Sequence, residues 1–202
     1  FTQISHPGTL WLGEGFVYLN NKQIDKVEGI SSTLFEHNYL KDSWPSKTNV
    51  SIIQVWNYIL NKTTLFEKFS STKIERALSS FTYLFSDSYH KDIPVALFWS
   101  LSGLEALFVD GDVGITQQLN DKIQVFLGEI ETDKKRLKKL YNFRSSLIHG
   151  GMSIPIKDAI INDEKHLDEL YEMNTFASII LVSSLQKIIK NNLTELKFKY
   201  SY

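Results

Sequence analysis

The chain has 202 residues, enough for one domain with a sizeable core and somewhat few for two. Hydrophobic residues make up 43% of it and charged residues 22%, with only 4 prolines and 10 glycines, a profile typical of a folded, helix-rich protein. The formal net charge of -1 excludes a global basic field that would hold nucleic acid or a membrane surface. Because there is no cysteine, disulfides and thiolate metal sites are excluded, and we expect a reducing compartment, the cytoplasm.

Residues 1–49 read as an irregular N-terminal elaboration. The stretch from Leu10 to Leu19 looks like two short apolar strands around a glycine-containing turn, so we expect a small β-hairpin there. Residues 43–46 contain a proline and read as a loop. We therefore divide the chain into this elaboration and a helical domain over residues 50–202.

Helical periodicity dominates residues 50–202, where apolar residues recur three and four positions apart. The predicted helices cover approximately residues 52–60, 74–85, 93–109, 115–127, 133–149 and 164–191. About six helices and little strand predict an all-α helical bundle. Trp56 and Trp99 fall within these helices, and we expect both to pack in the core.

The segment Ile93–Val109 is nearly all apolar. It is at the short limit for a membrane span and carries Ser100, Ser102 and Glu105, so a buried central helix is favoured and no membrane partner is expected. Glu105 is the only acid in this segment, and its place among apolar residues needs an explanation.

Arg144 has the same unusual placement in the helix predicted over residues 133–149. At about 100° per residue, several apolar side chains fall within about 60° of it, namely Leu137, Leu140, Tyr141, Leu147 and Ile148. A guanidinium keeps its proton in proteins, so on an inward face it needs a partner. A pair between Glu105 and Arg144 accounts for both charges. Its role is either purely structural or functional, and the geometry alone leaves both open.

His149 ends the same helix, where Gly150 and Gly151 free the backbone. A protonated histidine in the last turn interacts favourably with the negative end of the helix dipole. Histidine is also the residue type whose ordinary pKa lies nearest to neutrality. It is therefore a candidate proton-transfer group. The alternative is a histidine that only caps the last carbonyl groups.

The outer face of this helix carries Lys135, Lys138 and Lys139, a local basic strip that is a candidate site for RNA phosphates. A basic run of this kind is also common on a merely solvated helix face, and acidic residues just upstream dilute its field.

The run from Arg144 to His149 has the form R-x4-H and precedes Gly150-Gly151, and the earlier stretch Leu101–Phe108 reads LSGLEALF. Together these motifs resemble the HEPN superfamily, in particular the Apea-like HEPN group, in which an LExLF-type helix precedes a helix that ends in RSxxxHG. The resemblance covers roughly residues 74–191.

The resemblance implies a helical bundle that dimerises, with the R-x4-H motifs of two subunits facing one another. It also implies a metal-independent endoribonuclease of stress or phage defence, with an antitoxin or regulatory protein as a further possible partner. His149 would be the acid/base group, Arg144 would stabilise the scissile phosphate, and Glu105 would be the polar partner in the earlier helix. Such chemistry needs a group that titrates near neutrality and a fixed cation.

Ser145 follows the arginine at a position where active HEPN members often carry Asn, Asp or His. A serine hydroxyl can still hydrogen-bond a phosphate or the arginine, so Ser145 stays among the candidate catalytic residues. Two alternatives remain open: a non-catalytic HEPN module that binds RNA or nucleotide or regulates another protein, and a structural helical interaction domain.

A metal site is not expected, because the histidines are well separated and form no paired spacing. They are His6, His37, His90, His149 and His166. The sequence has no glycine-rich phosphate loop and no nucleophile elbow, so no cofactor is expected.

Overall fold

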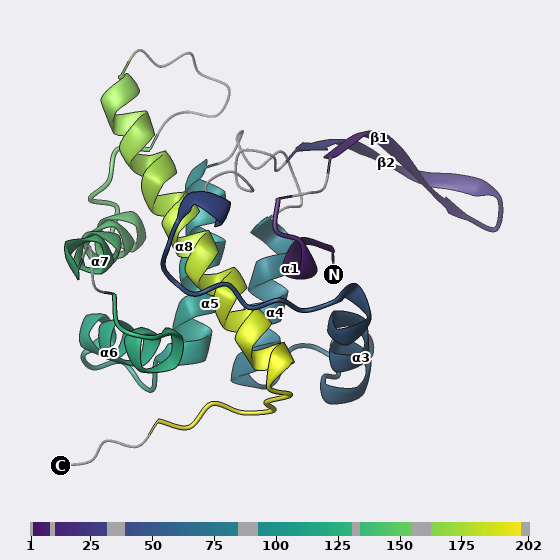
Figure 1. The fold of residues 1–202 in the computed structure, drawn as a ribbon. Coiled ribbons are helices and arrows are strands. Elements are labelled where there is room, and N and C mark those ends of the chain that lie inside the picture. The colour runs from purple at the N-terminus through teal and green to yellow at the C-terminus, as the bar shows by residue number, and fades with distance from the viewer. Residues whose placement is uncertain are drawn as a thin grey trace.

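The computed structural model describes residues 2–8, 11–31, 39–84, 93–130, 134–154 and 163–198. Helices dominate it, and two strands near the N-terminus form a hairpin (Figure 1). The predicted all-α bundle with a small β-hairpin is therefore confirmed. The helices whose full extent the structure describes are α1 Thr2–Ser5, α3 Ile52–Lys62, α4 Lys73–Leu84, α5 Ile93–Phe108, α6 Ile115–Leu127, α7 Lys134–Ile148 and α8 Glu164–Lys190.

The centre of the bundle is formed by α5, which packs most extensively against α4 and α8. Most side chains of α8 between Leu170 and Ile189 are buried, and α5 buries the predicted apolar segment. Gly103 allows a close approach of these helices, since a Cβ there would lie 2.8 Å from Leu181 Cδ2. One turn earlier, the Ser100 and Ser178 hydroxyls hydrogen-bond at 2.9 Å. None of the helices that the structure describes has both the length and the apolar character of a membrane span.

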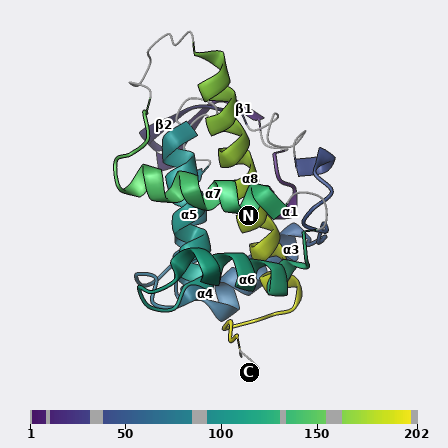
Figure 2. The same cartoon turned by 90° about the vertical axis from the view of Figure 1, so that its left-hand side faces the viewer.

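The remaining helices cover different sides of this centre. In Figure 2, α7 crosses in front of α5 and α8, with α6 beside it. In Figure 1, α3 lies on the other side of the molecule from α7, where it contacts α1 and α8. Trp99 packs against the core as expected, but the expectation for Trp56 was wrong, because its side of α3 faces solvent and the residue is 42% exposed.

The hairpin is present, but its turn lies outside the stretch from which it was predicted. Strand β1 runs over Trp11–Leu19 and pairs antiparallel with β2, Lys22–Ser31. The turn is Asn20-Asn21, whose φ angles of 51° and 62° lie in the left-handed region that asparagine tolerates better than most residues. The glycines at 13 and 15 lie within β1, which extends away from the helices (Figure 1).

The N-terminal residues that precede α3 also contact the bundle. Gln186 of α8 donates to the carbonyl oxygen of Ile4 at 2.8 Å and accepts from the Tyr39 hydroxyl at the same distance. The indole of Trp44 donates to the Gly128 carbonyl at 3.0 Å. The division of the chain at residue 50 remains a prediction, and these bonds tie parts of the first segment to the helices of the second.

A single buried carboxylate holds the connection between α3 and α4. Glu75, 3% exposed, accepts hydrogen bonds from the backbone and hydroxyl of Thr64, from the backbone and hydroxyl of Ser71, and from the backbone of Thr72, at 2.7–3.0 Å. The backbone bond from Thr64 is the largest of several that lower the pKa of Glu75 far below its usual range, against the opposing effect of burial.

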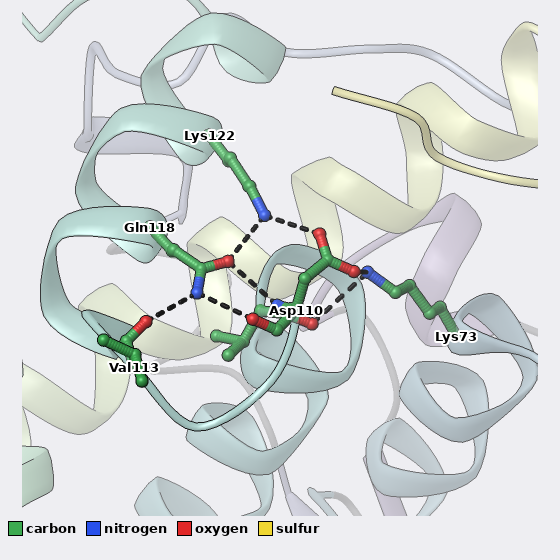
Figure 3. Close-up of polar contacts among 6 residues, drawn as sticks. Lys73, Asp110, Val113, Gln118 and Lys122 are labelled. Atoms are coloured by element: carbon green, nitrogen blue, oxygen red, sulfur yellow. Dashed lines mark hydrogen bonds and ion pairs between the residues drawn. The ribbon is translucent and has the colours of Figure 1, made fainter. Parts of the chain in front are cut away.

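A second polar network holds the connection between α5 and α6 (Figure 3). The Asp110 carboxylate pairs with Lys73 and, at 2.7 Å, with Lys122, which is only 3% exposed. Both ion pairs lower the pKa of Asp110, Lys122 more than Lys73. The Gln118 amide donates to the backbone carbonyls of Asp110 and Val113, each at 2.9 Å. These contacts fix the residues that follow the C-terminal turn of α5.

Candidate functional site

The expected pair between Glu105 and Arg144 is present and bidentate. Arg144 Nε donates to Glu105 Oε1 at 2.5 Å, and Arg144 Nη2 donates to Glu105 Oε2 at 2.9 Å. The pair forms because α7 turns Leu137, Leu140 and Tyr141 into the core against its neighbours, which brings Arg144 to the side of α5. It joins the penultimate turn of α7 to the last turns of α5.

The pair lies at the edge of the core and is not fully enclosed. The Arg144 and Glu105 side chains are 17% and 25% exposed. The hydrogen bonds that Arg144 donates to Glu105 raise the pKa of Arg144 above its already high value, so the guanidinium is a permanent cation. Glu105 engages Nε and Nη2, and the fork of a guanidinium has a third nitrogen, Nη1, whose two N–H groups can donate to an anion at the surface.

His149 follows α7 directly and is exposed. Its backbone N–H donates to the Ser145 carbonyl at 3.0 Å, and the N–H of Gly151 donates to the Ser146 carbonyl at 2.8 Å. With Gly150 at a φ of 70°, these bonds form a Schellman-type helix end. The predicted stop of the helix at Gly150 is confirmed, whereas the predicted start at Asp133 lies outside the described residues.

Arg144, Ser145 and His149 all lie at the C-terminal end of α7, but Arg144 lies on a different side of the helix from the other two. Ser145 is exposed, and it lies four residues before His149, so the two share one face of the helix. Arg144 lies about 140° away from His149 around the axis and roughly 7–8 Å from it along the axis. Within the described part of the chain, no hydrogen bond or ion pair joins the His149 side chain to Glu105 or Arg144. The helix therefore presents a fixed cation and a separate, solvent-facing imidazole at one end.

The three lysines of the basic strip differ in their surroundings. Lys135 and Lys138 are exposed. Lys139 Nζ lies 2.8 Å from Glu169 Oε1 on α8 and 3.8 Å from Glu172 Oε2, and the hydrogen bond that it donates to Glu169 is the main cause that raises the pKa of Lys139. A phosphate would have to displace or share these carboxylates to reach Lys139, so Lys135 and Lys138 are the better placed cations.

The strip is also distant from His149. Lys138 precedes it by eleven residues, which at about 1.5 Å per residue is roughly 16 Å along the helix. The lysines and the histidine therefore cannot contact one phosphate, and a bound RNA strand would have to run along α7 to meet both.

The sequence did not indicate the surroundings of Arg136. Its guanidinium donates to Asp42 Oδ2 at 2.7 Å and lies 4.0 Å from the centre of the Phe176 ring. Arg136, Asp42 and Glu172 contribute to the lining of a surface cavity of about 380 Å³ beside the first half of α7. No signal in the sequence pairs Arg136 with Asp42, because 94 residues separate them and only the packed fold brings them together.

Among the described residues, no three His, Asp or Glu side chains gather in a way that could hold a metal ion. No family model, no curated protein and no solved structure matches the chain. A functional assignment therefore depends on the R-x4-H motif and on the geometry of the helix end that carries it.

Proposed function

We infer that the protein is a metal-independent endoribonuclease of HEPN type. The single observation that carries this proposal is the end of α7, where Arg144 is fixed by the two hydrogen bonds it donates to Glu105 while His149 is exposed at the glycine stop. The pair holds the cation in one orientation, as electrostatic stabilisation of a charged transition state requires. Because His149 is exposed at the end of α7, its imidazole can contact a substrate.

In the proposed reaction, His149 takes the proton from a ribose 2′-hydroxyl, and the resulting oxygen attacks the adjacent phosphorus. The bond from phosphorus to the 5′ oxygen breaks, and that oxygen leaves with a proton from a second acid. Arg144 donates through Nη1 to the phosphorane oxygens as their charge grows, and Ser145 hydrogen-bonds a neighbouring phosphate oxygen. The products are a 2′,3′-cyclic phosphate and a 5′-hydroxyl end.

The second acid in this proposal is His149 of another copy, in a dimer whose two R-x4-H motifs face one another. The R-x4-H motif of each chain provides one proton-transfer group, His149, whereas the reaction uses a base and an acid. A cytoplasmic role in stress or phage defence, held in check by an antitoxin or regulatory protein, belongs to the same proposal.

A binding-only HEPN module is the second candidate. Two observations favour it: Ser145 stands where active members often carry Asn, Asp or His, and two of the three Arg144 guanidinium nitrogens are engaged by Glu105. In this case Lys135, Lys138 and Arg144 bind RNA or nucleotide, and no bond is broken.

The test is an RNA-cleavage assay with the wild type and His149→Ala, with His6→Ala as the matched control. His6 is also exposed, and it follows α1, which lies on the other side of the molecule from α7 (Figure 1). We expect a loss of at least 100-fold for His149→Ala, the lower range for removing a general acid or base, and no loss for His6→Ala. RNA that binds equally to all three proteins and stays intact would favour the binding-only module.

A further inference from the structure

Helix α3 has two apolar faces, and the bundle covers only one of them. Val55, Tyr58 and Ile59 are buried. On the other side, the exposed stripe consists of Ile52, Ile53, Trp56 and Leu60, with exposed fractions of 44%, 65%, 42% and 52%. Trp56 follows Ile53 by three residues, Leu60 follows Trp56 by four, and Leu60 follows Ile52 by eight. These spacings are typical of a helix face that packs against another helix.

The loop after α3 extends this apolar surface. The Phe66 ring lies 6.0 Å from the ring of Trp56, and Phe69, farther along the loop, is 98% exposed. The buried carboxylate of Glu75 holds the two ends of the loop through five hydrogen bonds. The loop is thus anchored by a buried charge, and Leu65 packs against the core, while Phe66 and Phe69 face solvent.

The charges around this surface favour a protein over a lipid partner. The polar positions that flank the stripe on α3 are the uncharged Gln54, Asn57 and Asn61, with Lys62 at the end of the helix. The loop adds two exposed residues of opposite charge, Glu67 and Lys68, between its phenylalanines. Helices that lie on a membrane usually carry several lysines or arginines on their polar side. A centre rich in aromatic and aliphatic residues and poor in charge is instead typical of the core of a protein interface.

We propose that this surface, the α3 face formed by Ile52, Ile53, Trp56, Leu60, Phe66 and Phe69, binds the same face of a second copy of the chain. A face whose central stripe has no charge meets no electrostatic repulsion from itself. At about 200 Å² per aromatic side chain, its three aromatic residues alone expose on the order of 400 Å², half of the ~800 Å² that each partner of a stable complex buries.

The stripe is also arranged for two-fold pairing. Trp56 lies at its middle, with Ile52 and Ile53 on one side and Leu60 on the other. In an antiparallel pair of α3 helices, Trp56 lies near the two-fold axis and Leu60 packs against Ile52 and Ile53 of the other copy, so each apolar residue meets an apolar residue.

This contact is separate from the proposed pairing of the two R-x4-H motifs. Figure 1 places α3 and α7 on different sides of the bundle, so pairing through the α3 face leaves Arg144 and His149 uncovered. The inference therefore does not depend on ribonuclease activity.

Cross-linking at a single engineered thiol tests the proposal. The chain has no cysteine, so Asn57→Cys on the exposed flank of the stripe introduces one reactive position next to the two-fold axis. We expect a short bis-maleimide to give a covalent dimer in dilute solution. The matched control is Val125→Cys, at a 76% exposed position on α6, which should not cross-link.

Adding Ile53→Ser and Phe69→Ser to the Asn57→Cys chain should remove the cross-link. Each substitution is present in both copies, so four apolar side chains are removed from the contact. At about tenfold for each, the association constant should fall by about ten-thousandfold. Circular dichroism should be unchanged, because both side chains are exposed in the single chain.

Cross-linking of Asn57→Cys no greater than that of Val125→Cys would overturn the proposal, and so would a cross-link that survives Ile53→Ser with Phe69→Ser. Binding to phosphatidylserine vesicles that requires Ile53 and Phe69, without self-cross-linking, would assign the face to a lipid surface instead. Since the readout involves neither Arg144 nor His149, a negative result leaves the ribonuclease proposal standing, and an inactive enzyme leaves this one standing.

Discussion

The bond between Glu105 and Arg144 predicts a large energetic coupling between two residues that are 39 positions apart in the sequence. We consider Glu105→Leu, Arg144→Met and the double variant. Each single change leaves a partly buried charge without its partner, whereas the double change replaces both charges by apolar side chains at the edge of an apolar core.

The exposure of the pair sets the size of this coupling. Removing one member of a fully buried pair costs about 3–5 kcal/mol, while exposed pairs contribute about 0–1 kcal/mol. With side chains 17% and 25% exposed and two parallel hydrogen bonds, the pair lies between these limits. We expect each single variant to lose about 2 kcal/mol of unfolding free energy and the double variant to lose no more than either, a coupling of about 2 kcal/mol.

Urea unfolding of the four proteins measures this coupling in a double-mutant cycle. The pair of Lys139 on α7 and Glu169 on α8 is the control, because it has a similar distance of 2.8 Å but side chains 37% and 40% exposed. Its coupling should not exceed about 0.5 kcal/mol. Additive effects of Glu105→Leu and Arg144→Met, within about 0.5 kcal/mol, would refute the reasoning that each charge is stabilised by the other.

Three further predictions concern the buried carboxylate of Glu75, the glycine that ends α7 and the lysines of the basic strip. Glu75→Gln should lower the unfolding free energy, measured in urea, by about 2–3 kcal/mol at neutral pH, since it removes the charged acceptor of the hydrogen bonds in a buried loop. The pKa of Glu75 is lower in the folded than in the unfolded chain, so the ionised carboxylate stabilises the fold. The difference between the two proteins should therefore shrink as the pH falls below the unfolded pKa of about 4.3. Gly150→Ala should cost about 1 kcal/mol in thermal or urea unfolding for its positive φ, and it should reduce RNA cleavage by displacing His149. In a titration of RNA affinity against salt, Lys138→Ala should reduce the slope by about 1, and Lys139→Ala should reduce it less because Glu169 already pairs with that lysine.

Much of the helical framework could be predicted, because periodic apolar residues and glycine or polar stops determine helices locally. The pairing of Glu105 with Arg144 could also be predicted, since a charge that cannot be neutralised on an apolar stripe requires a partner, and α5 offers a single acid. Here a local conflict in the sequence identified a long-range contact.

Other features could not be predicted from the local pattern of the sequence. The turn of the hairpin was misplaced because glycine was taken as its signal, whereas Asn20 and Asn21 adopt the left-handed conformation. Trp56 was expected in the core because it belongs to the apolar stripe of the helix predicted over residues 52–60. The apolar residues of α3 lie on two sides, and only the packing of the bundle determines which side is covered. Glu169 reduces the availability of Lys139 through the contact of α7 with α8, which no spacing within α7 reveals.

The central claim is that His149 and Arg144 cleave RNA without a metal ion, and the direct measurement is the chemical nature of the product ends. We predict that the wild type, treated with excess chelator, cleaves RNA to fragments with 2′,3′-cyclic phosphate and 5′-hydroxyl ends, and that His149→Ala and Arg144→Met with native circular dichroism yield none. Cleavage that disappears with chelator, fragments with 5′-phosphate ends, or equal cleavage by His149→Ala would contradict the account.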